Sequence, residues 1–152
     1  MKRISLIVLL LIPFIGFCQD SVETQIKSTI KLFFEGLQNG DTLTVSKTIH
    51  ANFRGLTTYL NKEGNSVIAD EVSREGFLKT IASKKPEDVW LEKLLSCTIE
   101  IDQNLANVWT PYEFYVNDNF SHCGSNSFQL VYLDEKWKIV SVIDTRRREN
   151  CR

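Results

Sequence analysis

An aromatic cluster in the second half of the chain holds the side chains best able to act on a small molecule. Glu113 and His122 lie within it, and carboxylate and imidazole groups are common general acids and bases. The aromatic members of the cluster are Trp109, Tyr112, Phe114, Tyr115 and Phe120. Apolar walls with a few polar groups are typical of small-molecule pockets. We therefore take His122 and Glu113 as the candidate acid–base residues.

Strand alternation divides this cluster between two faces of a sheet. It places Trp109, Glu113 and Tyr115 on one face and Tyr112 and Phe114 on the other. Only one of these sets can face a pocket. The alternative interpretation is packing in a core or a dimer interface, since aromatic side chains dominate both.

Two residues from an earlier β-prone segment are further pocket candidates. Arg54 and Tyr59 lie in Asn52–Leu60, and both could add polar groups at the pocket mouth. Pro111, inside the aromatic segment, cannot donate a ladder hydrogen bond and therefore indicates an edge or a bulge.

Cysteine–histidine catalysis and metal binding are not expected. His122 and Cys123 are adjacent, and successive strand side chains point to opposite faces, so the imidazole would not reach the thiol. Neither these residues nor Cys97 and Cys151 have the paired spacing of structural zinc sites. We expect no metal and no cofactor.

The cysteines instead indicate one disulfide. Cys97 alternates with Leu95, Ile99 and Ile101, which is the pattern of a core-facing thiol. Cys123 and Cys151 are therefore the expected pair, and their bond would attach the C-terminal tail to the sheet. The basic run at residues 146–148 has the composition of a solvated tail.

The periodicity predicts helices first and strands last. Helices are expected from residue 22 to Leu37, from residue 41 or 42 to Ile49, and after Ser73. A short strand is expected around Ser66–Glu71, after the β-prone Asn52–Leu60. A four-strand antiparallel meander follows, at Glu92–Asp102, Leu105–Asn117, Ser121–Leu133 and Trp137–Thr145. This order predicts one α+β domain.

Residues 1–18 have the pattern of a cleavable secretory signal peptide. Basic residues precede an apolar run from Ile4 to Phe17 that is too short to cross a bilayer comfortably. Small side chains at Gly16 and Cys18 place the expected cleavage after Cys18. A lipid anchor is the alternative, although it would need a small residue where Phe17 stands. We expect residues 19–152 to form a periplasmic or secreted domain.

Several stretches carry a resemblance to a known superfamily. These are Gln38–Asp41, Ala51–Phe53 and Glu135–Val140, together with Val108–Tyr115 and Ser121–Gly124. They are similar to the nuclear transport factor 2-like superfamily, and the last two to its exported branch labelled lumazine-binding or SnoaL-like. The resemblance implies a cone: a strongly curved antiparallel sheet wrapped around three N-terminal helices. It also implies a homodimer formed through the sheet.

The resemblance does not extend to the catalytic residues of ketosteroid isomerase. Those relatives place a general-base Asp on the strand after the second helix, whereas Asn52–Thr58 contains no carboxylate. They also use a Tyr in the first helix, which is absent here. Two of the parts needed for enolisation are missing, so we do not expect that chemistry.

The sequence therefore favours an exported domain that binds a small, partly apolar molecule, or that pairs with itself or another exported protein. The alternative is a SnoaL-like isomerase, cyclase or dehydratase acting on a small cyclic substrate. A third alternative is a purely structural or inhibitory partner protein. Cleavage would remove Lys2 and Arg3 and change the formal net charge from −1 to −3, which gives no indication of nucleic acid or of a membrane as a partner of the mature domain.

Overall fold

The computed structural model describes residues 21–151. The elements are, in chain order, α1 (Val22–Asn39), α2 (Thr42–Thr48), β1 (Ile49–Leu60), β2 (Ser66–Ile68), β3 (Val72–Ser73), α3 (Arg74–Ala82), β4 (Trp90–Leu94), β5 (Thr98–Asp102), β6 (Leu105–Val116), β7 (Asn119–Leu133) and β8 (Lys136–Arg146). The predicted signal peptide, residues 1–18, lies outside the described residues. Among residues 21–151, no helix is long and apolar enough to span a bilayer.

Local signals explain the corner between α1 and α2. Gly40 ends α1 with a φ of +68°, a left-handed conformation that costs glycine least. Asp41 then caps α2, because its carboxylate accepts hydrogen bonds from the backbone N–H groups of Leu43 and Thr44, both at 3.0 Å. The predicted second helix is therefore present, although it ends at Thr48 and leaves Ile49 as the first residue of β1.

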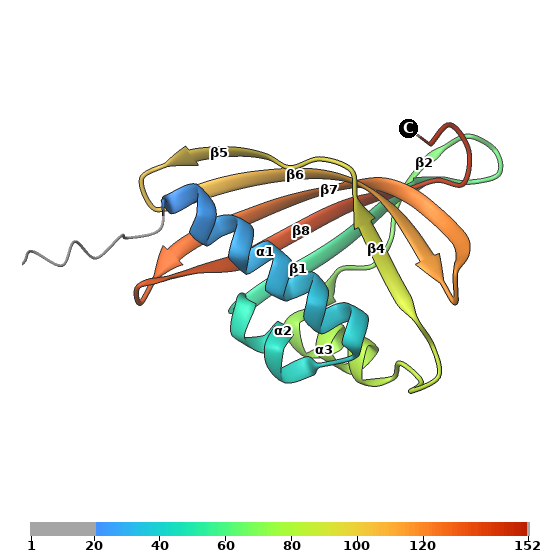
Figure 1. Cartoon of the computed structure of the whole chain (residues 1–152). Coiled ribbons are helices and arrows are strands. Elements are labelled where there is room, and N and C mark those ends of the chain that lie inside the picture. The colour runs from blue at the N-terminus through green and yellow to red at the C-terminus, as the bar shows by residue number, and fades with distance from the viewer. Residues whose placement is uncertain (1–20, 152) are drawn as a thin grey trace, which may run out of the picture.

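The strands form one curved sheet in the order β2-β1-β8-β7-β6-β4, with β3 beside β1 and β5 beside β6. Figure 1 shows the three helices on one face of this sheet. The C-terminal strands pair as antiparallel hairpins, as predicted. The turns at Asn117-Asp118 and Asp134-Glu135 have positive φ at both residues, which suits two-residue hairpins. β1 and β8, however, pair in parallel, so the sheet is mixed and not antiparallel throughout.

One predicted strand proves to be two. The segment Glu92–Asp102 forms β4 and β5, which pair with different parts of β6 and are separated by residues 95–97. The alternation that predicted a core-facing Cys97 breaks at this gap, and the Cys97 side chain is exposed. Pro111 lies opposite the same gap, where its carbonyl accepts from Leu95 N–H at 2.8 Å, so its missing donor faces the break between strands.

The core fills the space between the helices and the concave face of the sheet. It contains buried side chains of α1, α2, α3, β1, β6, β7 and β8. Within it Phe33 lies edge-on to Phe34 and to Phe128, and the partly buried Phe77 stacks on Phe33 at 5.6 Å between ring centroids. These four rings also line the cavity between the helices and the sheet.

A register shift in β8 decides which of its residues face the interior. Trp137 and Ile139 are buried in the core. Continued alternation would turn Asp144 outward, yet Val140 is an extra residue relative to β7. Beyond this bulge the even-numbered positions face inward, and Asp144 is 9% exposed.

Candidate functional site

A cavity of about 320 Å³ lies at the open end of the cone. Helices α1 and α3 form one side of it, and strands β4, β6, β7 and β8 form the other. Its apolar lining residues are Phe33, Phe34, Leu37, Phe77, Ile81, Trp90, Phe114, Val116, Phe128 and Val142. Its polar lining residues are Thr80, Glu92, Tyr112, His122, Asn126, Asp144 and Arg146. All of these polar residues except Thr80 come from the sheet.

Asp144 is the centre of a hydrogen-bonded group on the sheet side. Its Oδ1 accepts from the Thr57 hydroxyl at 2.6 Å, and its Oδ2 accepts from Arg146 Nε at 2.8 Å. The Tyr112 hydroxyl lies 3.2 Å from Oδ2 and 3.1 Å from the Thr145 carbonyl oxygen. Both carboxylate oxygens are thus satisfied within the protein, which offsets the cost of burying the charge.

Tyr112 is held as a neutral donor. Burial raises the pKa of its hydroxyl far above the ordinary value, and the neighbouring carboxylates of Asp144 and Glu92 raise this pKa further. The phenol therefore keeps its proton at neutral and moderately alkaline pH.

Glu92 forms a second polar group, together with Asn126 and Thr110. The Asn126 amide donates to Glu92 Oε1 at 2.7 Å and to the Thr110 hydroxyl at 3.3 Å. Burial raises the pKa of Glu92 from 4.5 to about 7, and the nearby Asp144 carboxylate acts in the same direction. Near neutral pH the Glu92 carboxyl is therefore divided between its acid and its ionised form.

His122 lines the cavity as a neutral imidazole. Burial, followed by the charge of Arg146, lowers its pKa to about 4, even though Asp144 opposes this effect. Its Nδ1 is 3.0 Å from the Ser121 hydroxyl oxygen, and its ring centroid lies 5.1 Å from that of Phe114. At neutral pH this side chain adds a polar edge to the wall and no charge.

The wall beside Tyr112 depends on close backbone packing at Gly124. A Cβ atom built there would lie 1.7 Å from the Thr145 carbonyl oxygen and 2.9 Å from the Tyr112 ring. The same carbonyl accepts the Tyr112 hydroxyl hydrogen bond. A side chain at position 124 would therefore displace both the strand and the ring, so glycine is required.

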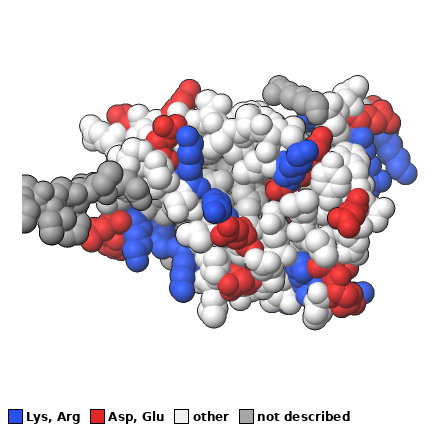
Figure 2. All heavy atoms as spheres, viewed as in Figure 1, with Lys and Arg blue, Asp and Glu red and all other residues white. Residues whose placement is uncertain are grey.

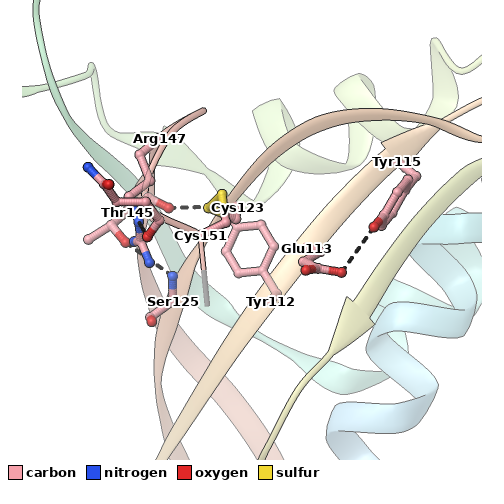
Figure 3. The surroundings of a disulfide bond; sticks show 9 residues. Tyr112, Glu113, Tyr115, Cys123, Ser125, Thr145, Arg147 and Cys151 are labelled. Atoms are coloured by element: carbon pink, nitrogen blue, oxygen red, sulfur yellow. Dashed lines mark hydrogen bonds between the residues drawn. A yellow bond between two sulfur atoms is a disulfide. The ribbon is translucent and has the colours of Figure 1, made fainter.

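The predicted disulfide between Cys123 and Cys151 is formed. Next to it, the backbone groups of Cys123 and Arg147 exchange two hydrogen bonds of 2.9 Å, and Thr145 accepts from Ser125 N–H at 3.1 Å (Figure 3). These bonds hold the end of β8 against β7. Because Cys123 is oxidised, it offers no thiolate to its neighbour His122.

The sequence candidates divide between the cavity and the surface. Tyr112 and His122 line the cavity. Glu113 and Tyr115 lie on the other face of β6, joined by a 3.0 Å hydrogen bond from the tyrosine hydroxyl to the carboxylate (Figure 3). Trp109 shares that face and is 46% exposed.

The two candidates on β1 lie away from the cavity lining. Arg54 is exposed and forms an ion pair of 3.8 Å with the exposed Glu71. Tyr59 is exposed on the part of β1 that pairs with β2. Both side chains therefore lie on the surface of the described structure and do not line the cavity.

Four polar cavity residues from the sheet were not among the candidates: Glu92, Asn126, Asp144 and Arg146. For Glu92 a signal existed, since Trp90, Glu92 and Leu94 share one face of a strand and place a carboxylate between two apolar neighbours. Asp144 and Arg146 gave no such signal, because the β8 bulge reverses the alternation that would have shown them. Arg146 was expected in a solvated tail; its side chain is exposed, but the residue ends β8 and lines the cavity beside Asp144.

Metal binding has no support among residues 21–151, where no three His, Cys, Asp or Glu side chains cluster as ligands. Charges of both signs are interspersed on the face shown in Figure 2. That face therefore offers no continuous basic surface of the kind that nucleic acids bind.

Comparison with known proteins shows the fold. No protein-family model matches the chain, and no curated protein matches it. Three solved structures are similar over 82–84% of this chain. A nuclear transport factor 2-like protein from Cytophaga hutchinsonii has a TM-score of 0.67, 14% identity and 100% coverage of that chain. A nuclear transport factor 2-like superfamily protein from Salmonella enterica serovar Typhimurium has a TM-score of 0.66, 12% identity and 92% coverage of that chain.

The third is a candidate dehydratase of the same family from Streptomyces avermitilis, with a TM-score of 0.59, 12% identity and 94% coverage of that chain. These likenesses establish that the chain has the nuclear transport factor 2-like fold. The same fold supports many unrelated functions, so function has to be argued from the site.

Proposed function

We propose that this chain is an exported domain that binds a small, partly apolar molecule in its cone and does not transform it. The observation that carries the proposal is the cavity of about 320 Å³, with apolar walls and polar groups gathered on the sheet side. Pockets of this size and composition are typical of small-molecule sites. The apolar wall would bury the body of the ligand, and the polar groups would orient it.

The hydrogen bonds of the polar groups support binding without reaction. Asp144 accepts three hydrogen bonds and the Asn126 amide donates two, all within the protein. His122, the candidate acid–base residue that reaches the cavity, has a pKa of about 4 and would bind few protons at neutral pH. Such a network is rigid and suited to recognition.

Export is part of the proposal. The Cys123–Cys151 disulfide is the kind of bond that persists in oxidising compartments. Residues 1–18 have the composition of a signal peptide. We place the working domain, residues 19–152, in the periplasm or outside the cell.

Native mass spectrometry of protein purified from the exported fraction, under non-reducing conditions, tests this proposal. We expect a mass that begins at Gln19, is two hydrogens lighter than the reduced chain, and includes a bound small molecule. Thr80→Trp would fill the cavity from an exposed helix position and should remove the bound molecule. Lys79→Trp, on the exposed neighbouring position outside the lining, is the matched control. A ligand-free protein, or equal occupancy in Thr80→Trp, would contradict the proposal.

A second candidate is an acid–base enzyme acting on a small cyclic substrate, as a SnoaL-like protein would. Glu92 favours it, because a carboxyl with a pKa of about 7 inside a cavity is suited to proton transfer at neutral pH. Glu113, on the outer face, could not take this role. NMR would follow exchange of the α-protons of cyclohexanone in D₂O. Exchange above the buffer rate that is lost in Glu92→Gln supports an enzyme, and exchange at the buffer rate argues against it.

We further propose that two copies pair through the outer face of the sheet. Trp109, Ser127 and Ile143 are register partners across β6, β7 and β8, and they place an exposed Trp and an exposed Ile in one row. Burial of such a row on a second copy would remove apolar surface from water. Light scattering after size-exclusion chromatography should give a dimer for the native chain and a monomer for Trp109→Glu.

A further inference from the structure

Negatively charged side chains outnumber positively charged ones in the cavity lining. Glu92 and Asp144 contribute two carboxylates and Arg146 one guanidinium, while His122 is neutral. The charge of Arg146 is already directed at Asp144, through the 2.8 Å bond between its Nε and Oδ2. Among the described residues Glu92 forms no ion pair, and the charge of Arg146 favours its ionised form only from a longer distance.

The carboxyl of Glu92 also has unused hydrogen-bonding capacity. The structure gives it one hydrogen bond, from the Asn126 amide to Oε1. A carboxylate can accept about four hydrogen bonds, so a donor on a bound molecule would find acceptor positions open. Because burial opposes ionisation of this group, a donor that carries positive charge would gain most from it.

Aromatic rings line the same side of the cavity as this carboxyl. Trp90 and Phe114 lie 6.4 Å apart between ring centroids, at an interplanar angle of 64°, and Tyr112 and Phe128 complete the aromatic lining of the sheet side. Glu92 and Phe114 are direct cross-strand partners. Ring faces attract cations, and more strongly when water is excluded.

We propose that the cavity takes a small organic cation, namely a primary amine on an aromatic or cyclic apolar body, with its ammonium group against Glu92. This inference rests on the proposed function, because it names the chemical class of the ligand of the same cavity. Asp144 would add attraction at longer range, and the helices α1 and α3 would cover the apolar body.

Binding of such a ligand is coupled to the proton of Glu92. The charged or titratable groups facing it are Tyr112 from β6, His122 from β7, and Asp144 and Arg146 from β8. The helices contribute only apolar residues and Thr80 to the lining. Burial raises the pKa of Glu92 to about 7, whereas the pKa of His122 is lowered to about 4 and that of Tyr112 is raised far above its ordinary value. A bound ammonium group favours the ionised form of Glu92. At pH 7, where about half of the Glu92 carboxyls carry a proton, binding should therefore release about half a proton per amine.

Three shape-matched probes test the proposal by calorimetry: benzylamine, benzyl alcohol and benzoate. We expect benzylamine to bind tightest and its affinity to rise between pH 6 and pH 8, while the amine itself stays protonated. Titration in buffers of different ionisation enthalpy should show the proton release. Glu92→Gln keeps an oxygen for the Asn126 hydrogen bond and should weaken benzylamine binding at least about tenfold. Glu113→Gln, on the outer face, is the matched control and should leave binding unchanged.

The outcomes separate this inference from the function beneath it. Benzyl alcohol or benzoate binding as tightly as benzylamine would overturn the cation proposal and leave a small-molecule site in place. The same conclusion would follow from an unchanged affinity in Glu92→Gln. Failure of all three probes to bind would overturn both proposals for ligands of this size.

Discussion

Replacing Glu92 by Gln should stabilise the protein at alkaline pH, although it removes a polar cavity residue. The pKa of Glu92 is raised in the folded state, to about 7 from 4.5. The folded state therefore holds the Glu92 proton more tightly than the unfolded state does. Well below pH 4.5 the Glu92 carboxyl is protonated in both the folded and the unfolded state, so it does not lower the free energy of unfolding. As the pH rises toward 7 the unfolded state gains from ionisation first, so folding becomes less favourable.

The magnitude follows from the difference between the two pKa values. Each pKa unit corresponds to about 1.4 kcal/mol, so the cost of ionised Glu92 approaches roughly 3 kcal/mol above pH 7. At pH 5 the same pair of values gives a cost of less than about 1 kcal/mol. Because Glu92 is only partly buried and part of its charge is screened by solvent, these figures are upper bounds.

Urea unfolding followed by circular dichroism, at pH 5 and pH 8, measures this difference. We expect the midpoint of Glu92→Gln to exceed that of the native chain clearly at pH 8 and only slightly at pH 5. Glu113→Gln loses the 3.8 Å ion pair with the exposed Lys93 and keeps an oxygen for the Tyr115 hydrogen bond, so it should show no gain at either pH. An equal gain at both pH values would refute the assignment to ionisation, and a loss at pH 8 would show that the carboxylate is stabilised in the fold.

Three other changes test the structure around the cavity. Gly124→Ala should destabilise the fold by more than about 3 kcal/mol or prevent folding, because the new Cβ would collide with the Thr145 carbonyl oxygen. Thermal unfolding measures this loss, and a change under about 1 kcal/mol would contradict the close approach of the two backbones. Cys151→Ser removes the disulfide to Cys123, which spans a sequence separation of 28, and should lower the free energy of unfolding by about 3 to 4 kcal/mol. Urea unfolding measures this loss. The native chain with its disulfide reduced should be as stable as Cys151→Ser, and a clear difference between the two would contradict the assignment to the disulfide. Tyr112→Phe removes a buried hydroxyl donor and should lower the free energy of unfolding by about 1 to 2 kcal/mol in the same urea assay. No measurable change would mean that other donors replace the tyrosine at Asp144 and at the Thr145 carbonyl.

Much of the fold follows from local patterns in the sequence. The glycine and aspartate at positions 40 and 41, the Ser73 cap of α3 and the polar two-residue turns each specify one local geometry. These signals depend on neighbours within a few residues, so they can be read without the tertiary structure. The pairing of Cys123 with Cys151 was also predictable, although the argument placed Cys97 in the core and the structure places it on the surface.

The rest depends on contacts that are distant in sequence. The parallel pairing of β1 with β8 joins segments nearly at opposite ends of the domain, and no local pattern encodes it. The bulge at Val140 is set by the register against β7, so Asp144 could not be placed inside from alternation alone. Glu92 is different, because its alternation with Trp90 and Leu94 lies within β4 and could have been recognised from the sequence.

The position of β8 has a consequence for the order in which the chain can mature. The last strand in the sequence is a central strand of the sheet, flanked by β1 and β7. During synthesis β1 and β7 both emerge before their shared neighbour exists, so each exposes an unpaired edge until the C-terminal residues arrive. The sheet therefore cannot close until β8 has been synthesised, and Cys123 cannot meet its partner until Cys151 has followed.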